Sequence, residues 1–264
     1  MSSLPRLFFA HANGFTPEAY RQLLQPLRSD YAVEAPALKP LRTGNMPAGS
    51  WHEIAADLGE MLDASAAATV GVGHSLGAVA LLMAAAAQPK RFQHLVLIEP
   101  PAIAAWAAVL LRHAPASIRQ KSPLARAARR RADRWATFEE ALAQERSRRW
   151  FARVPDAVLS DVLEHGLREE GGAWRLSFHK EWEARLYETP TSVWPLLKQP
   201  LPPITLLRGA HSAVLGAAAA ARWRLMRPQD RVIEVANSGH LLPLELPQQV
   251  AAVIAAQAQA AFCR

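Results

Sequence analysis

The sequence predicts an α/β fold: a mostly parallel β-sheet with helices on both faces and a helical segment inserted into it. Short apolar runs alternate with helix-like segments up to about residue 98, and the alternation resumes at residue 204. The stretch between them lacks strong strand patterns and is typical of several consecutive helices. A G-x-S-x-G sequence also separates one predicted strand from the helix that follows it.

The first part of the chain contains four predicted strands, which are apolar runs at 6–10, 31–35, 69–72 and 94–98. Between them the apolar spacing predicts helices at 17–27, 51–62 and 75–87. Thr16, which precedes Pro17, and Ser50 are suitable N-cap residues for the first two helices. The run at 94–98 is continuously apolar, as expected for a strand that is buried on both faces of a parallel sheet.

The inserted segment contains six of the eight tryptophans and ends in a proline-rich connector at 195–203. After it, strands are predicted at 204–207 and 231–235, and helices at 214–226 and 247–262. We therefore expect two domains. Residues 1–100 and 196–264 form the α/β core, and residues 101–195 form a helical cap domain inserted after the strand that ends at Glu99.

Charge and composition narrow the class of protein. The formal net charge is +7, and the stretch from Arg119 to Arg153 carries eleven Arg or Lys residues against four acids. Such a cluster can contact anionic partners, but no nucleic-acid-binding motif accompanies it, so we expect no nucleic-acid partner. Cys263 is the only cysteine, no signal peptide is evident, and the longest uncharged apolar run, 104–111, is too short to span a bilayer. These features favour a cytoplasmic protein without a membrane span.

Ser75 is the strongest candidate for a catalytic residue. It lies in Gly73-His-Ser-Leu-Gly77, directly between a predicted strand and a predicted helix. In this setting a serine occupies a strained tight turn that exposes its hydroxyl group, and small residues are needed on both sides because the backbone is crowded there. Ser75 is therefore predicted to be a nucleophile.

A serine hydroxyl is a poor nucleophile unless a base accepts its proton. Among the nine histidines, His240 follows the last predicted strand, so its loop lies at the carboxyl edge of the sheet, where the serine turn also emerges. None of the histidines has a zinc-ligand spacing, so no metal and no cofactor is expected. His240 is therefore the predicted base.

An attacked carbonyl group develops negative charge that fixed donors must stabilise. The backbone N–H of Leu76, at the start of the helix, and that of Asn13, in the first strand–helix turn, are the predicted donors of this oxyanion hole. His11 and Phe15 from the same turn, together with Trp106 and Trp135 from the insertion, are predicted to contact the substrate.

These motifs resemble those of the α/β-hydrolase superfamily. His11-Ala-Asn-Gly, Gly73-His-Ser-Leu-Gly77 and Gly239-His-Leu-Leu-Pro243 occur in the order of that superfamily, and the insertion lies where its members carry a cap domain. The resemblance implies the same fold and the same roles for Ser75, His240, Asn13 and Leu76. The sequence differs from the family pattern in three places. It begins at the family's third strand, Ala12 replaces the usual glycine after His11, and Gly209-Ala-His-Ser-Ala213 lacks the usual acid.

The third member of the triad is therefore open. Glu99, at the end of the strand after the nucleophile helix, is the candidate acid, because some superfamily members place the acid there. A Ser–His dyad assisted by water, or Glu234 on the last strand, are the other possibilities.

The sequence thus predicts a serine hydrolase that cleaves a carboxylic ester or similar small acyl substrate through an acyl-enzyme. Two alternatives remain. The protein could be a non-catalytic ligand-binding member that has lost the acid, or the cluster at 119–153 could bind an anionic polymer. The sequence does not indicate the oligomeric state.

Overall fold

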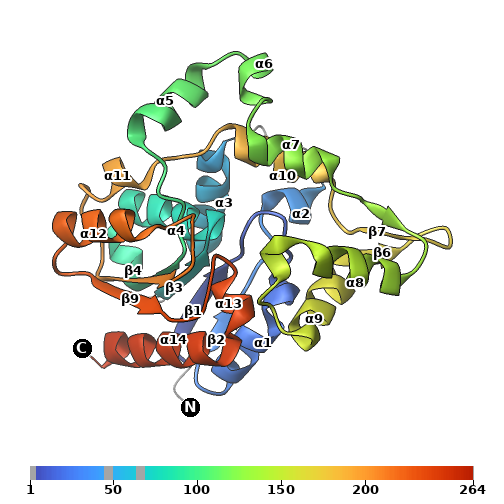
Figure 1. The fold of residues 1–264 in the computed structure, drawn as a ribbon. Coiled ribbons are helices and arrows are strands. Elements are labelled where there is room, and N and C mark those ends of the chain that lie inside the picture. The colour runs from blue at the N-terminus through green and yellow to red at the C-terminus, as the bar shows by residue number, and fades with distance from the viewer. Residues whose placement is uncertain (1–3, 45–49, 64–68, 264) are drawn as a thin grey trace.

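The centre of the protein is a six-stranded, fully parallel sheet. The structure, a computed structural model, describes residues 4–44, 50–63 and 69–263. The strand order is β2-β1-β3-β4-β8-β9 (Figure 1). The strands are β1 (Arg6–Ala10), β2 (Ala32–Glu34), β3 (Thr69–His74), β4 (Phe92–Ile98), β8 (Ile204–Gly209) and β9 (Arg231–Val235). The predicted fold class is confirmed, and the bounds of β1 and β9 are those the sequence predicts.

Helices cover both faces of this sheet. Alternate side chains of β1 enter two different apolar cores: Leu7 and Phe9 enter one, and Phe8 and Ala10 enter the other. The first core is closed by α1 (Arg21–Leu24) and α14 (Pro247–Phe262). The second is closed by α3 (Trp51–Asp63), α4 (Leu76–Ala87) and α12 (Ala217–Met226). The inner strands β1, β3, β4 and β8 are therefore buried on both sides, which explains their continuous apolar runs. The edge strands β2 and β9 are partly exposed.

The predicted helix at 17–27 is broken into three short pieces. A 3₁₀ turn at Pro17–Tyr20 precedes α1, and a second one follows at Gln25–Ser29. Pro26 lacks the N–H that a continuous helix needs, which accounts for the second break. The Thr16 side chain forms no cap hydrogen bond, contrary to prediction, whereas Ser50 Oγ does accept a hydrogen bond from the N–H of His52 (3.2 Å).

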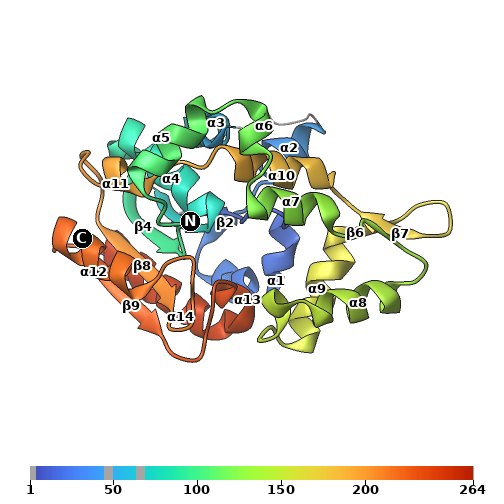
Figure 2. The same ribbon diagram turned by 45° about the horizontal axis from the view of Figure 1, so that its top comes forward.

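The chain between β4 and β8 is largely helical and lies to one side of the sheet (Figures 1 and 2). Its helices are α5 (Ala105–His113), α6 (Ala116–Arg119), α7 (Pro123–Arg130), α8 (Phe138–Ser147), α9 (Asp156–Gly166), α10 (Lys180–Glu188) and α11 (Val193–Leu196). The remaining short helices of the described chain are α2 (Lys39–Thr43) and α13 (Leu242–Glu245), with 3₁₀ turns at Pro89–Arg91 and Arg149–Phe151. None of the helices in the described ranges is long and apolar enough to cross a membrane.

The inserted segment also contains three short strands, which the sequence analysis did not predict. Strands β5 (Arg134–Trp135), β6 (Leu167–Glu169) and β7 (Trp174–Leu176) form a small antiparallel sheet of order β5-β7-β6. Gly171 and Gly172, with φ of +61° and +70°, form the turn between β6 and β7. Strands of two or three residues are too short to show an alternating pattern in the sequence.

Two glycines provide a test of how tightly the serine turn packs. A Cβ atom at Gly77 would overlap the carbonyl oxygen of Ala10 in β1, whereas a Cβ at Gly59 in α3 would meet no atom within 4 Å. We predict that Gly77→Ala lowers the free energy of unfolding by about 3 kcal/mol. Gly59→Ala should raise it by roughly 0.5–1 kcal/mol, because alanine favours the helix.

Urea denaturation followed by tryptophan fluorescence measures both changes. Equal unfolding free energies for the two variants would contradict this description of the turn.

Candidate active site

Ser75 occupies a strained turn between β3 and α4. Its φ and ψ are +54° and −116°, a conformation that non-glycine residues rarely adopt. Its N–H donates to the carbonyl oxygen of Ile98 (2.9 Å), which attaches the turn to the end of β4. The predicted helix at 75–87 therefore begins one residue later, at Leu76. The side chain of Ser75 consequently projects from the carboxyl edge of the sheet.

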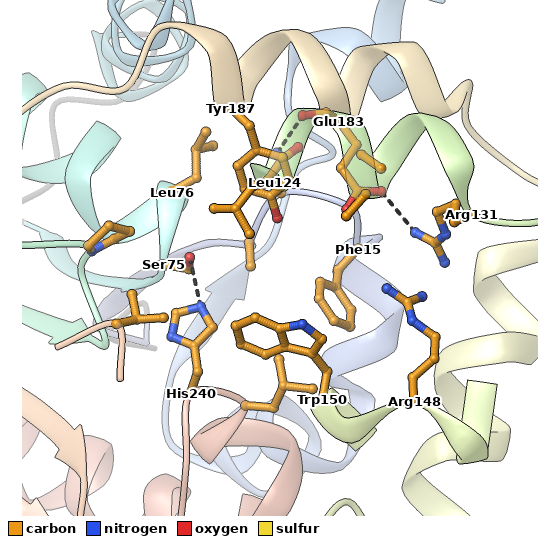
Figure 3. A pocket seen from close by; sticks show the side chains of 18 of the residues that line it. Phe15, Ser75, Leu76, Leu124, Arg131, Arg148, Trp150, Glu183, Tyr187 and His240 are labelled. Atoms are coloured by element: carbon orange, nitrogen blue, oxygen red, sulfur yellow. Dashed lines mark hydrogen bonds and ion pairs between the residues drawn. The ribbon is translucent and has the colours of Figure 1, made fainter. Parts of the chain in front are cut away.

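His240 lies in the loop between β9 and α13, within hydrogen-bond reach of Ser75. Its Nε2 accepts from Ser75 Oγ at 3.1 Å (Figure 3). The loop is held from both sides: the N–H of Gly239 donates to Glu245 Oε2 (2.7 Å), and Ser238 Oγ donates to the carbonyl oxygen of Val235 (2.8 Å). These bonds fix the imidazole ring where it can accept the serine proton.

Glu99 completes a line of three groups. It follows β4 with φ of +53°, its side chain is fully buried, and its Oε2 accepts from His240 Nδ1–H at 3.2 Å. The N–H of Gly209 donates to Oε1 (2.6 Å), and Ser212 Oγ donates to Oε2. Three donors therefore satisfy the oxygens of this buried carboxylate.

The other candidate acid lies elsewhere. Glu234 forms an ion pair with Arg208, and about half of its side chain is exposed. Ala213 has no polar group, but Ser212 beside it donates to Glu99. The sequence shows that this loop lacks an acid, yet no pattern in it indicates that Ser212 donates a hydrogen bond to an acid that follows another strand.

The two predicted oxyanion donors lie beside Ser75. Asn13 and Leu76 both line the same cavity as Ser75, and neither backbone N–H forms a hydrogen bond to any residue in the described ranges. Asn13 Nδ2 donates to the carbonyl oxygen of Glu183 in α10 (3.0 Å). Gly14, with φ of +78°, lets this loop approach Glu183, whose Cδ would lie 2.9 Å from an added Cβ. The first loop is therefore attached to the inserted segment.

His74 and Tyr20 connect this first loop to the loop of His240. The N–H of Ala12 donates to the Tyr20 hydroxyl (3.2 Å), which in turn donates to His74 Nδ1 (2.7 Å). His74 Nε2–H then donates to the carbonyl oxygen of His240 (2.9 Å). Burial lowers the pKa of His74 well below 6.5. His74 is thus held neutral, with one ring nitrogen accepting and the other donating.

A cavity of about 510 Å³ opens beside Ser75 and His240. Its wall comes from the carboxyl edge of the sheet and, in the inserted segment, from α5 and from helices α7 to α10. Phe15 and Trp150 lie between the serine side and the arginine side of this pocket in Figure 3. The Trp150 ring also packs edge-on against His240, with ring centroids 5.6 Å apart. Ser75 and His240 are thus bordered by aromatic side chains.

The far side of the cavity carries a charged cluster formed by Arg131, Arg148, Glu145 and Glu183. Arg131 Nη1 donates to Glu183 (2.9 Å), and Arg148 Nη1 donates to Glu145 (2.5 Å). Arg131 also lies 3.6 Å from Glu145. Its Nε is buried and has no hydrogen-bond partner among the described residues. The cluster therefore retains a buried donor.

Of the four residues predicted to contact a substrate, only Phe15 lines this cavity. The Trp106 side chain is 73% exposed, and Trp135 is buried, with its Nε1–H donating to Gln144. His11 is also buried, and its Nε2 accepts from the N–H of Leu38 (2.9 Å). His11 and Trp135 therefore form hydrogen bonds inside the protein, and Trp106 faces solvent away from the cavity. Trp150 lines the cavity instead. The sequence does not indicate which of the six tryptophans of the insertion faces the cavity, because it does not predict how the helices are arranged.

A parallel sheet with a strained serine turn between a strand and a helix, at its carboxyl edge, is typical of one class of α/β proteins. The model of the Alpha/beta hydrolase family matches residues 7–253, so the chain belongs to this family. No curated protein matches the sequence.

Solved structures share the fold at low sequence identity. E-2-(acetamidomethylene)succinate hydrolase aligns with a TM-score of 0.76 and 21% identity, over 97% of this chain and 91% of the other. An esterase of M. tuberculosis aligns with a TM-score of 0.74 and 19% identity, over 98% and 86%. A malate-bound esterase of Thermogutta terrifontis aligns with a TM-score of 0.69 and 17% identity, over 99% and 92%.

Buried neutral histidines make the stability of the fold depend on pH. Burial lowers the pKa of His11 from 6.5 to about 4. The unfolded chain therefore binds a proton at this position more readily, and stability that is fully present above pH 6.5 is lost as the pH falls toward 4. For His11 alone the predicted loss is about 3 kcal/mol.

Urea denaturation between pH 7.5 and pH 4.5 measures this slope. His11→Gln, which keeps an acceptor for the N–H of Leu38, should show a shallower dependence than the wild-type protein. Identical slopes would show that His11 does not remain neutral in the folded state.

Proposed function

We propose that the protein is a serine hydrolase that cleaves a carboxylic ester or a similar acyl compound through an acyl-enzyme intermediate. The observation that carries this proposal is the unbroken hydrogen-bonded series from Ser75 through His240 to Glu99 beside the cavity. Membership of the Alpha/beta hydrolase family supports it.

In this mechanism Ser75 Oγ attacks the substrate carbonyl carbon while His240 Nε2 removes the serine proton. Glu99 accepts from His240 Nδ1–H, which keeps Nε2 free to act as a base and then stabilises the imidazolium ion. The N–H groups of Asn13 and Leu76 stabilise the oxyanion. His240 next protonates the leaving group, and a water molecule, activated by the same imidazole, hydrolyses the acyl-enzyme.

Glu99 would replace the acid that is missing at Ala213. The loop after β8, which resembles the family's acid-bearing loop, here supplies two hydrogen-bond donors to Glu99 through Gly209 and Ser212. The loop therefore supports the carboxylate instead of carrying it. A carboxylate that directly follows β4 thereby accepts the hydrogen bond from His240 Nδ1–H.

Residues 101–195 would act as a cap that forms the outer wall of the substrate cavity. A volume of about 510 Å³ suits a small molecule. The acyl group would pack near Phe15 and Trp150, and a polar or anionic tail would reach Arg131, whose Nε lacks a partner in the described chain. E-2-(acetamidomethylene)succinate hydrolase and the malate-bound esterase share the fold, and the names of both structures mention small carboxylic acids.

The first functional prediction concerns the nucleophile. Ser75→Ala should reduce hydrolysis of short-chain p-nitrophenyl esters to the background rate, because no other hydroxyl of the described residues is hydrogen-bonded to the His240 ring. Ser160→Ala, on the outer surface of α9, serves as the matched control and should retain full activity. Circular dichroism checks that both variants fold. Turnover by a folded Ser75→Ala protein at the wild-type rate would refute the mechanism.

A second functional prediction concerns the acid. Glu99→Gln should lower kcat about 10³- to 10⁴-fold, because the amide does not hold the imidazole tautomer that leaves Nε2 unprotonated. Glu234→Gln is the matched control, and its kcat should change by less than about twofold, since exposed charges away from the site contribute little.

The kcat values of both variants come from initial-rate assays on the same ester. A large loss in Glu234→Gln with none in Glu99→Gln would exchange the two roles. If neither variant loses activity, a Ser–His dyad is the better mechanism. An absence of both ester turnover and labelling of Ser75 by a fluorophosphonate would favour a non-catalytic binding protein.

A further inference from the structure

Helices α5, α6 and α7, here called the α5–α7 surface (residues 105–130), form an unusual part of the exterior. They lie along one edge of the molecule, far from α14 and β9 (Figures 1 and 2). Eight large apolar side chains are exposed in the part of the chain that the structure describes, and five of them belong to this surface. They are Trp106, Val109, Leu110, Ile118 and Leu124, with exposed fractions of 73%, 58%, 63%, 51% and 49%.

Helix α5 presents its large apolar side chains to solvent. Trp106, Val109 and Leu110 have the i, i+3, i+4 spacing of one helix face, and all three are exposed. The residue of α5 that is buried is the small Ala108. In a surface helix of a soluble protein the large apolar stripe normally faces the core. The exposed face of α5 is therefore suited to contact an apolar phase outside the protein.

The same surface carries only positive charge. The sequence from 100 to 132 contains no Asp or Glu and has seven Arg or Lys residues. Arg129 and Arg131 are paired with acids of α10, but Arg112, Lys121, Arg126 and Arg130 are exposed. Arg126, Arg129 and Arg130 also line an open hollow next to α7, together with Gln120 and Glu181. An anionic group could enter this hollow.

The α5–α7 surface also borders the cavity beside Ser75. Leu111, Ser122 and Leu124 belong to it and line the cavity wall. Leu124 is therefore both a lining residue and an exposed residue. The exposed apolar face is thus continuous with the wall of the cavity.

We propose that the α5–α7 surface docks the protein onto a membrane leaflet rich in anionic phospholipid. Trp106, Val109 and Leu110 enter the boundary between headgroups and acyl chains, where tryptophan is favoured. Arg126 and Arg130 contact headgroup phosphates, which attract basic residues close to a surface. This partner matches both the exposed apolar face and the basic cluster of the surface, because an anionic leaflet has an apolar phase directly beneath a layer of negative charge.

Charge argues against a second copy of the same face as the partner. Two α5–α7 surfaces packed together would bring two exposed basic clusters close to one another, and like charges repel. An acidic protein would satisfy the arginines, but it would need an apolar groove to cover three exposed side chains of α5. The lipid surface satisfies both without further requirements.

Binding to vesicles tests this proposal directly. The full chain carrying Ser75→Ala is sedimented with vesicles of phosphatidylcholine alone and with vesicles in which about a third of the lipid is phosphatidylglycerol. We expect binding to the anionic vesicles to be at least about tenfold stronger and to weaken at high salt. Tryptophan fluorescence should shift to shorter wavelength on binding. Because the protein tested has no serine nucleophile, the outcome does not depend on the proposed hydrolase activity.

Matched variants locate the contact. The double variant Arg126→Glu/Arg130→Glu should weaken binding to anionic vesicles by about tenfold or more, and Trp106→Ala should remove most of the fluorescence shift. Arg224→Glu and Leu225→Ala, both exposed on α12, are the controls and should bind like the parent protein. Unchanged denaturation midpoints show that the variants remain folded.

Three results would overturn the proposal. The first is no binding to either vesicle, and the second is equal binding by the double variant and its control. The third is a dimer, seen without lipid by analytical ultracentrifugation, that Trp106→Ala dissociates, because a second copy would then cover the face. Binding to heparin but not to anionic vesicles belongs with the first result and would indicate an anionic polymer instead.

Discussion

A buried carboxylate must be matched by hydrogen-bond donors, and the carboxyl edge of this sheet is arranged around one such group. Glu99 is fully buried, and donors reach it from two other loops: Gly209 and Ser212 after β8, and His240 after β9. An unpaired charge at this depth would be strongly destabilising. The requirement to satisfy Glu99 therefore fixes the position of His240, and with it the distance from His240 to Ser75.

A second, uncharged series of hydrogen bonds steadies the same edge. It runs from Ala12 through Tyr20 and His74 to the carbonyl oxygen of His240. The loop that carries Asn13 and the loop that carries His240 are thereby connected to one another through His74, the residue before Ser75. Since Asn13 also bonds to Glu183 of α10, the inserted segment is connected to the same arrangement. Strain at Ser75 is tolerated because its neighbours leave it little freedom to relax.

The sequence predicted the parts of the molecule whose signals are local. Strand β1 and the Ser75 turn follow from apolar runs and small residues, and His240 follows from its position after the last strand. What depends on packing between distant segments was not predictable. The short strands of the insertion carry no periodic pattern. The hydrogen bond from Ser212 to Glu99 forms only where two loops come together. That Trp150 lines the cavity, and Trp106 does not, depends on how the helices of the inserted segment are arranged. Sequence spacing carries no information on such tertiary contacts.

Proton NMR of the exchangeable imidazole protons tests the central claim, that Glu99 holds the Nδ1–H of His240. A strong hydrogen bond to a buried carboxylate moves such a proton far downfield of the backbone amides. We expect one such resonance at low pH and low temperature. It should be absent in His240→Ala, shifted strongly upfield in Glu99→Gln, and unchanged in Glu234→Gln. A resonance that persists at its wild-type position in Glu99→Gln would show that another acceptor, and not Glu99, holds the imidazole ring.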